Sequence, residues 1–146
     1  MGNNFEWLNS ICNNILVHKV WYDDQVILLN PHNTVCRWDE DGYINACDIV
    51  GITNDYYCAR ITPTWLQLLE NLKRFSRFQN DNRNHGLEDL IKIIHSEDVF
   101  PPDFKRVYEL NGQYYIGTGH HRLTVAKFLD VKQIKVEIMH VCQRER

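Results

Sequence analysis

The stretch between residues 114 and 126, YYIGTGHHRLTVA, constrains the fold more than any other part of the chain. A β-prone apolar run leads into Gly117 and Gly119, and a helical pattern of apolar residues follows Arg122. This order predicts a strand, a tight turn and the start of a helix. Glycine adopts φ > 0 readily and lets the backbone approach a ligand closely, so we expect both glycines to shape the turn.

The side chains at this junction are of the kind that bind anions. The N-terminus of a helix presents unpaired N–H groups and about half a positive charge, which favours a phosphate or a carboxylate. Arg122 can hold two phosphate oxygens at once. His120 and His121 add donors when protonated, and a neutral histidine can move a proton near neutral pH. The alternative is that both histidines only lie on an exposed turn. No metal site is predicted, because adjacent histidines lack the i, i+4 spacing of a helical zinc pair.

The residues around the junction predict a hairpin, a helix and a strand in that order. Asn111-Gly112 stands between the β-prone residues 107–110 and 113–116. Both turn residues tolerate φ > 0, as a two-residue hairpin turn requires. A helix is expected over residues 122–129. Apolar and charged residues then alternate over residues 134–138, which predicts a half-buried final strand.

The N-terminal part is predicted to hold one helix and several short strands. The spacing of apolar residues predicts a helix near residues 4–17, and β-prone runs predict strands at 25–29 and 34–38. Residues 39–42, Asp-Glu-Asp-Gly, are predicted to form a turn from which a return strand begins. Residues 45–61 show no clean period.

Two more helices are predicted in the middle of the chain. Thr62-Pro63 supplies a cap and a first helical residue, and an apolar stripe extends from there over residues 65–78. The polar residues 79–86 are predicted to be an exposed loop. Helical spacing returns over residues 87–95, and the segment 100–103, Phe-Pro-Pro-Asp, breaks that helix.

The composition is that of one globular domain. The chain has 146 residues, of which 44% are hydrophobic and 24% charged. The predicted class is α+β, a small mixed sheet with flanking helices over residues 1–146. Within it, residues 1–61 are an N-terminal helix and β-rich extension, and residues 62–146 are the core. No apolar run approaches the roughly 18 residues of a membrane span and no signal peptide is visible. We therefore expect a cytoplasmic protein without a membrane partner, whose five cysteines are free thiols.

The net charge of −3 is unevenly distributed. Residues 1–60 hold three Lys or Arg against eight Asp or Glu, and residues 61–100 hold five against six. Residues 101–146 hold eight against five. The part that contains the junction is thus the basic part, which suits an anionic ligand. Its excess is too small to predict duplex DNA binding from charge alone.

Residues 115–126, followed by Leu129, Ile134 and Val136, resemble the core motif of the ParB/sulfiredoxin-like superfamily. That superfamily includes ParB partition proteins, sulfiredoxins, free serine kinases and DNA-modification proteins. The resemblance covers about residues 86–140. It implies a ParB/sulfiredoxin-like hairpin-helix-strand unit that carries a Gly-x-x-Arg turn, with a nucleotide phosphate bound at that turn.

The residues at the Gly-x-x-Arg turn indicate which members of the superfamily this chain resembles most. Sulfiredoxins place a catalytic cysteine just after the glycine, but this chain has His120 there and no cysteine between positions 58 and 142. Sulfiredoxin activity, whose nucleophile is a thiolate, is therefore not expected. ParB proteins carry Gly-Glu-Arg-Arg, of which Gly119 and Arg122 match. The Asp-Gly-His-His-Arg variant of kinase-like and DNA-modification relatives is closest. Thr118 replaces its Asp and can still donate a hydroxyl to a phosphate.

The resemblance implies both a ligand and an activity. The ligand would be ATP, ADP or CTP with Mg²⁺ bridging the phosphates, and the activity that of a nucleotide hydrolase or phosphotransferase linked to DNA metabolism. Such a reaction needs a carboxylate to accept a proton, for which Glu88, Glu97 and Asp98 are candidates by position. His121 and Glu88 are the predicted catalytic residues. The predicted phosphate-binding residues are Gly117, Thr118, Gly119, His120, His121 and Arg122.

A second motif keeps another function open. Residues 41–48, DGYINACD, are similar to the Gly-Tyr-Ile-Asn-Ala-Thr core of KilA-N domains, which are DNA-binding modules of phage and large viruses. Cys47 replaces the Thr. The alternative function is a non-catalytic DNA-associated regulator of phage or plasmid type, in which Arg122 or Lys127 contacts DNA. Two simpler alternatives stay open. One is that residues 41–44 are only a turn that packs through Tyr43 and Ile44. The other is that the protein is an interaction protein that binds no ligand at the junction. A homodimer is compatible with each.

Overall fold

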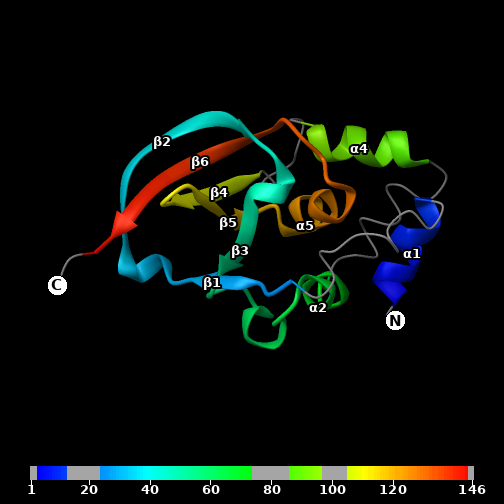
Figure 1. Cartoon of the computed structure of the whole chain (residues 1–146), viewed down its shortest axis with the longest axis horizontal. Coiled ribbons are helices and arrows are strands. Elements are labelled where there is room, and N and C mark those ends of the chain that lie inside the picture. The colour runs from blue at the N-terminus through cyan, green and yellow to red at the C-terminus, as the bar shows by residue number, and fades with distance from the viewer. Residues whose placement is uncertain (1–2, 13–23, 74–85, 97–104, 145–146) are drawn as a thin grey trace.

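The computed structural model describes residues 3–12, 24–73, 86–96 and 105–144. Its central feature is a six-stranded mixed sheet in the order β1-β3-β5-β4-β6-β2 (Figure 1). The pairs β1–β3, β3–β5 and β4–β6 are parallel, and the pairs β4–β5 and β2–β6 are antiparallel. The strands are β1 (Ile27–Leu29), β2 (Thr34–Ile44), β3 (Ile49–Thr53), β4 (Arg106–Leu110), β5 (Gln113–Thr118) and β6 (Ile134–Gln143).

Helices gather beside this sheet, which confirms the α+β class with a mixed sheet and flanking helices (Figure 1). Helix α5 is central, because it packs against both α2 and α4, while α1 packs against α2. Most of α5 is buried, so the core fixes the position of its first turn. The α-helices are α1 (Asn3–Ile11), α2 (Trp65–Glu70), α4 (Leu87–His95) and α5 (His120–Leu129), and the short 3₁₀ turns are η3 (Pro31–Asn33), η4 (Ala46–Asp48) and η5 (Ala59–Ile61).

The hairpin, helix and strand predicted near the C-terminus are all present. Asn111 and Gly112 have φ of 53° and 83°, as the two-residue turn between β4 and β5 requires. Helix α5 begins at His120, slightly before the predicted start. In β6, Ile134 and its alternate neighbours are buried, so the period of two correctly identified the inner face of the last strand.

The predicted turn at residues 39–42 is wrong, because these residues lie within the long strand β2. β2 pairs with β6 along its whole length, with a bulge between Cys36 and Trp38. Among the described strands it forms one edge of the sheet. Charged side chains are favoured on edge strands, where they face water and discourage pairing with other chains. The acidic run therefore marks an exposed edge instead of a chain reversal.

Gly42 is explained by packing, although it contributed to the turn signal. A Cβ at this position would lie 2.8 Å from Cδ1 of Ile138, a core residue of β6. The predicted packing of Tyr43 is also wrong, because its side chain is 63% exposed, whereas Ile44 beside it is buried. The segment that is similar to a KilA-N core is thus the end of an edge strand followed by η4.

The sheet takes strands from both sides of residue 61. β3 lies between β1 and β5, and β2 pairs with β6. The strands β1, β2 and β3 therefore belong to the same sheet as the C-terminal unit and do not form a separate extension. The segment 45–61 gave no period because its strand, β3, is almost entirely buried. A strand that is covered on both faces reads as a continuous apolar run.

Helix α2 starts later than predicted. Its N-cap is Thr64, whose Oγ1 accepts from the N–H of Gln67 at 3.3 Å, while Oε1 of Gln67 accepts from the N–H of Thr64 at 3.1 Å. This reciprocal pair is a capping box. The Thr62 hydroxyl instead donates to the carbonyl of Ala59. Of the predicted elements, residues 13–17, 74–85 and 100–103 lie outside the described residues.

Gly51 allows β1 to join the sheet, and its substitution tests this arrangement. A Cβ at Gly51 would lie 1.7 Å from the carbonyl oxygen of Ile27 in β1. We expect Gly51→Ser to destabilise the protein by about 1–3 kcal/mol, the usual cost of overpacking, in urea unfolding monitored by circular dichroism. Gly86→Ser is the matched control, because no atom lies within 4 Å of that site and serine is a good N-cap. Equal stability of the two variants would contradict the close approach of β1.

Candidate functional site

The strand β5 passes into helix α5 through a single left-handed residue. Gly119 has φ of 86° and occupies the N-cap of α5, and no side chain caps this end of the helix. The expectation of φ > 0 is confirmed for Gly119. It is wrong for Gly117, which lies inside β5 with an ordinary backbone. A Cβ at Gly117 would come within 2.9 Å of the Tyr108 ring, so packing of that ring is what requires a glycine there.

His120, the first residue of α5, is buried against an aromatic ring. Its side chain is 8% exposed and stacks on Tyr56, with ring centroids 3.5 Å apart and an interplanar angle of 6°. Burial, with a smaller contribution from the neighbouring His121, lowers the pKa of His120 to about 3 against the opposing effect of Asp55. His120 is therefore neutral near pH 7. Of the two forms considered for this histidine, the neutral imidazole fits its buried position, and it offers one donor and one acceptor.

The first turns of α5 hold buried polar atoms that have no hydrogen-bond partner among the described residues. Nε2 of His120 and Oγ1 of Thr124 are among them. Thr124 is fully buried and follows His120 by four positions, which places both side chains on the same side of the helix. Thr118 is the last residue of β5, two positions before His120, and its side chain is half-buried. The junction thus combines an uncapped helix start with unsatisfied polar atoms.

Arg122 is directed to the end of helix α4. Its Nη1 donates to the carbonyl of Ser96 at 3.0 Å and to that of Ile93 at 3.4 Å. Lys105 Nζ donates to the carbonyl of Ile94 at 2.7 Å. The last carbonyls of a helix lack intrahelical partners and carry partial negative charge. Arg122 and Lys105 therefore satisfy the C-terminus of α4 and fix α4 against α5.

Lys127 is also used inside the protein. Its Nζ donates to the carbonyl of Ile49 at 2.7 Å and lies 4.9 Å from the centre of the Trp65 ring. Burial lowers the pKa of Lys127, against nearby carboxylates of which Asp24 acts most strongly. Arg122 and Lys127, the residues expected to contact DNA, are 2% and 3% exposed. Their charges are therefore not offered to a large polyanion in this structure.

The predicted catalytic carboxylate is not brought to the junction. Glu88 is exposed in the first turn of α4, whereas the opposite end of that helix contacts Arg122. At 1.5 Å per residue these points are about 12 Å apart along the helix axis. His121, the other predicted catalytic residue, is half-buried as the second residue of α5. Glu97 and Asp98 lie outside the described residues.

A second polar cluster lies at the other end of the sheet and was not predicted. Tyr114, Glu109, His140 and Trp38 face one another in turn across β5, β4, β6 and β2. Side chains of directly opposed residues share one face of a sheet. These positions form no motif in the sequence. They become neighbours only through the register of four paired strands. Only the sheet order could have revealed this row.

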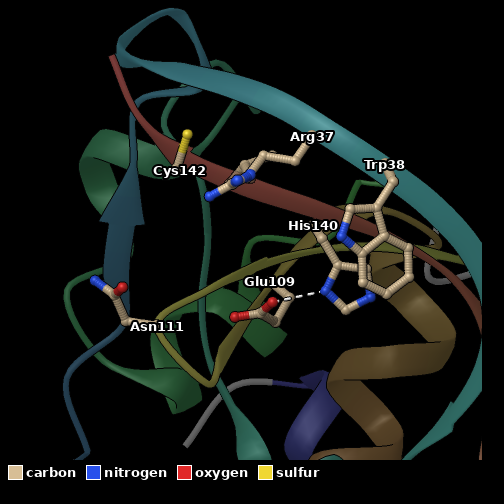
Figure 2. A pocket seen from close by; sticks show the side chains of 7 residues that line it. Arg37, Trp38, Glu109, Asn111, His140 and Cys142 are labelled. Carbon is tan, nitrogen blue, oxygen red and sulfur yellow. Dashed lines mark hydrogen bonds and ion pairs between the residues drawn. The ribbon is translucent and has the colours of Figure 1, made fainter. Parts of the chain in front are cut away.

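His140 is the centre of this cluster (Figure 2). Its Nδ1 lies 2.6 Å from Oε1 of Glu109 and its Nε2 lies 2.7 Å from Oε2 of Glu40. The indole of Trp38 stacks on the imidazole with centroids 3.7 Å apart. Burial lowers the pKa of His140, but the two carboxylates together raise it above its usual value. The N–H of Gly112, which donates to Glu109, lowers the pKa of that carboxyl.

The chain matches no protein-family model, no curated protein and no solved structure. None of the described helices combines the length and the apolar character needed to cross a membrane. Within the described ranges, His, Cys, Asp and Glu form no group of three that could hold a metal ion.

The cluster predicts a pH-dependent contribution to stability. Because the pKa of His140 is raised on folding, its contribution is complete below the unfolded pKa of about 6.5 and is lost as the pH rises through the folded pKa. We expect His140→Gln to lower the free energy of unfolding by about 1 kcal/mol at pH 5.5 and by clearly less at pH 9. Denaturant titrations at both pH values measure this difference. A loss that is equal at the two pH values would show that the protonated form is not the one stabilised.

Proposed function

We propose that this chain binds the phosphates of a nucleotide at the junction of β5 and α5. The observation that carries the proposal is the pair of unsatisfied atoms, Nε2 of His120 and Oγ1 of Thr124, at a helix start that no side chain caps. Buried polar groups in folded proteins are nearly always hydrogen-bonded, and each exception needs an explanation. A ligand with several acceptor oxygens would explain both exceptions together.

The attraction for an anion comes from the backbone and not from the histidine charge. His120 is neutral, so it would act as a hydrogen-bond donor from Nε2. The dipole of α5 supplies partial positive charge at the same place, and the left-handed Gly119 removes a Cβ from the approach. Arg122 adds its charge to this end of α5, while its described hydrogen bonds hold α4.

The ligand class is ATP, ADP or CTP, with Mg²⁺ bridging the phosphates as in other nucleotide sites. This class follows from the Gly-His-His-Arg motif at residues 119–122. The geometry adds hydrogen-bond donors and the positive end of the α5 helix dipole. A hydrolase or phosphotransferase activity linked to DNA metabolism would depend on His121, since Glu88 is at the far end of α4. Binding and turnover are separable, and binding is the claim tested first.

The test is a thermal-shift and calorimetric titration with ATP, ADP and CTP in the presence of Mg²⁺. A nucleotide at 100 times its Kd stabilises the folded state by about 2.7 kcal/mol, or roughly 5–10 °C in a protein of this size. We expect such a shift for at least one nucleotide. Arg122→Ala is not a useful variant, because it would leave the carbonyls at the end of α4 without a donor.

Two substitutions remove the proposed contacts with little damage to the fold. His120→Phe keeps a ring stacked on Tyr56, and Thr124→Val removes a buried hydroxyl that has no described partner. We expect the nucleotide shift to disappear in the double variant. Thr34→Val is the matched control, because the Thr34 hydroxyl donates to Pro31, next to β2 and away from α5. A shift that persists in the double variant would place the nucleotide elsewhere, and no shift in the parent protein would refute the proposal.

A further inference from the structure

A cavity of about 520 Å³ lies beside the His140 cluster. It is formed between β2, β6 and the turn of the β4–β5 hairpin (Figure 2). The β5–α5 junction begins at the opposite end of β5 from this turn, so the cavity is separate from the proposed nucleotide site. Its volume is within the range of small-molecule sites. It is lined by Arg37, Trp38, Glu109, Asn111, His140, Val141 and Cys142.

The negative side of this cavity is Glu109, which belongs to a carboxylate–histidine–carboxylate cluster with His140 and Glu40. Glu109 and Glu40 each bond one nitrogen of His140, and an imidazole that donates from both nitrogens is protonated. Two carboxylates and one imidazolium leave a net charge of about −1 at this wall. Each carboxylate oxygen can accept more than one hydrogen bond, so Glu109 can still accept from a ligand.

The positive side is Arg37. It lies at the bulge of β2 between Cys36 and Trp38, where the extra residue redirects side chains. Figure 2 shows that Arg37 extends from β2 across β6 toward Cys142, whereas Glu109 lies on the other side of the opening. Arg37 has no ion pair or hydrogen bond with any described residue. At the edge of the cavity, its guanidinium is therefore a donor that no group in the described part of the chain occupies.

An aromatic wall joins these two charged sides. The indole of Trp38 is 52% exposed although one of its faces is stacked on His140. The methylene chains of amphipathic molecules pack well against such aromatic surfaces while their charged ends stay polar. A simple anion in the cavity would meet Glu109, and a simple cation would meet Arg37. A molecule with separated opposite charges meets a complementary group at each end.

We propose that this cavity binds a small zwitterion of the ω-amino acid type. Its ammonium group lies against Glu109, its methylene chain lies on the Trp38 indole, and its carboxylate pairs with Arg37. A guanidinium binds a carboxylate through two parallel hydrogen bonds, which makes Arg37 the residue that selects for the acid. Free lysine and a peptide that ends in lysine carry the same groups, since the side-chain amine and the carboxylate are separated by methylenes.

The test compares three probes of equal chain length by calorimetry or NMR titration: 6-aminohexanoate, hexanoate and hexylamine. We expect saturable binding of 6-aminohexanoate below about 10 mM, and binding at least about tenfold weaker, or about 1.4 kcal/mol, for each singly charged analogue. Equal binding of hexanoate and 6-aminohexanoate would overturn the proposal and indicate a site for carboxylates only. The absence of saturable binding by all three probes would also overturn it.

Point variants distinguish an effect on binding in the cavity from an effect on the stability of the fold. Arg37→Gln is expected to weaken 6-aminohexanoate binding about tenfold and to leave the melting temperature unchanged, since Arg37 has no described partner. Arg60→Gln is the matched control, because Arg60 is exposed in η5 and does not line the cavity. Unchanged affinity in Arg37→Gln would refute the assignment of the carboxylate to this residue. The result does not depend on nucleotide binding, which is measured at the other end of the sheet.

Discussion

Three buried cations that donate to backbone carbonyls determine how the helices sit on the sheet. Arg122 and Lys105 hold the C-terminal carbonyls of α4, and Lys127 joins α5 to the start of β3 through the carbonyl of Ile49. The bonds of Arg122 and Lys127 connect segments that are distant in sequence. A buried charge without partners would be strongly destabilising, so these cations can be accommodated only in one arrangement of α4, α5 and β3. That arrangement fixes the first turn of α5, and with it the candidate phosphate site.

The sequence predicted the parts of the fold that depend on local rules. The hairpin at Asn111-Gly112 and the strand–glycine–helix order at Gly119 follow from backbone preferences that few other residues share. Three features were missed because distant neighbours decide them. Residues 39–42 are a strand because β6 pairs with them, and β3 shows no period because it is buried almost completely. The partners of Arg122 lie on a different helix.

The two candidate sites differ in the same way. The β5–α5 junction was identified from the sequence since its residues are contiguous, but its electrostatics were not, because the burial of His120 against Tyr56 removes the expected charge. The cavity at the hairpin end could not be identified at all from spacing. Its residues come from β2, β4, β6 and a turn, and only the register of the sheet makes them neighbours. The two candidate sites lie at opposite ends of one sheet, so a ligand at one of them would not block the other.

The outer edge of β2 has a consequence for contacts with other molecules. Asp39, Glu40 and Asp41 lie on a strand that pairs with β6 on one side and, among the described strands, forms an edge of the sheet on the other. Charged side chains on an edge strand discourage pairing with the edge of a second molecule. A run of neutral, β-prone residues in their place would turn the same strand into a template for cross-β assembly.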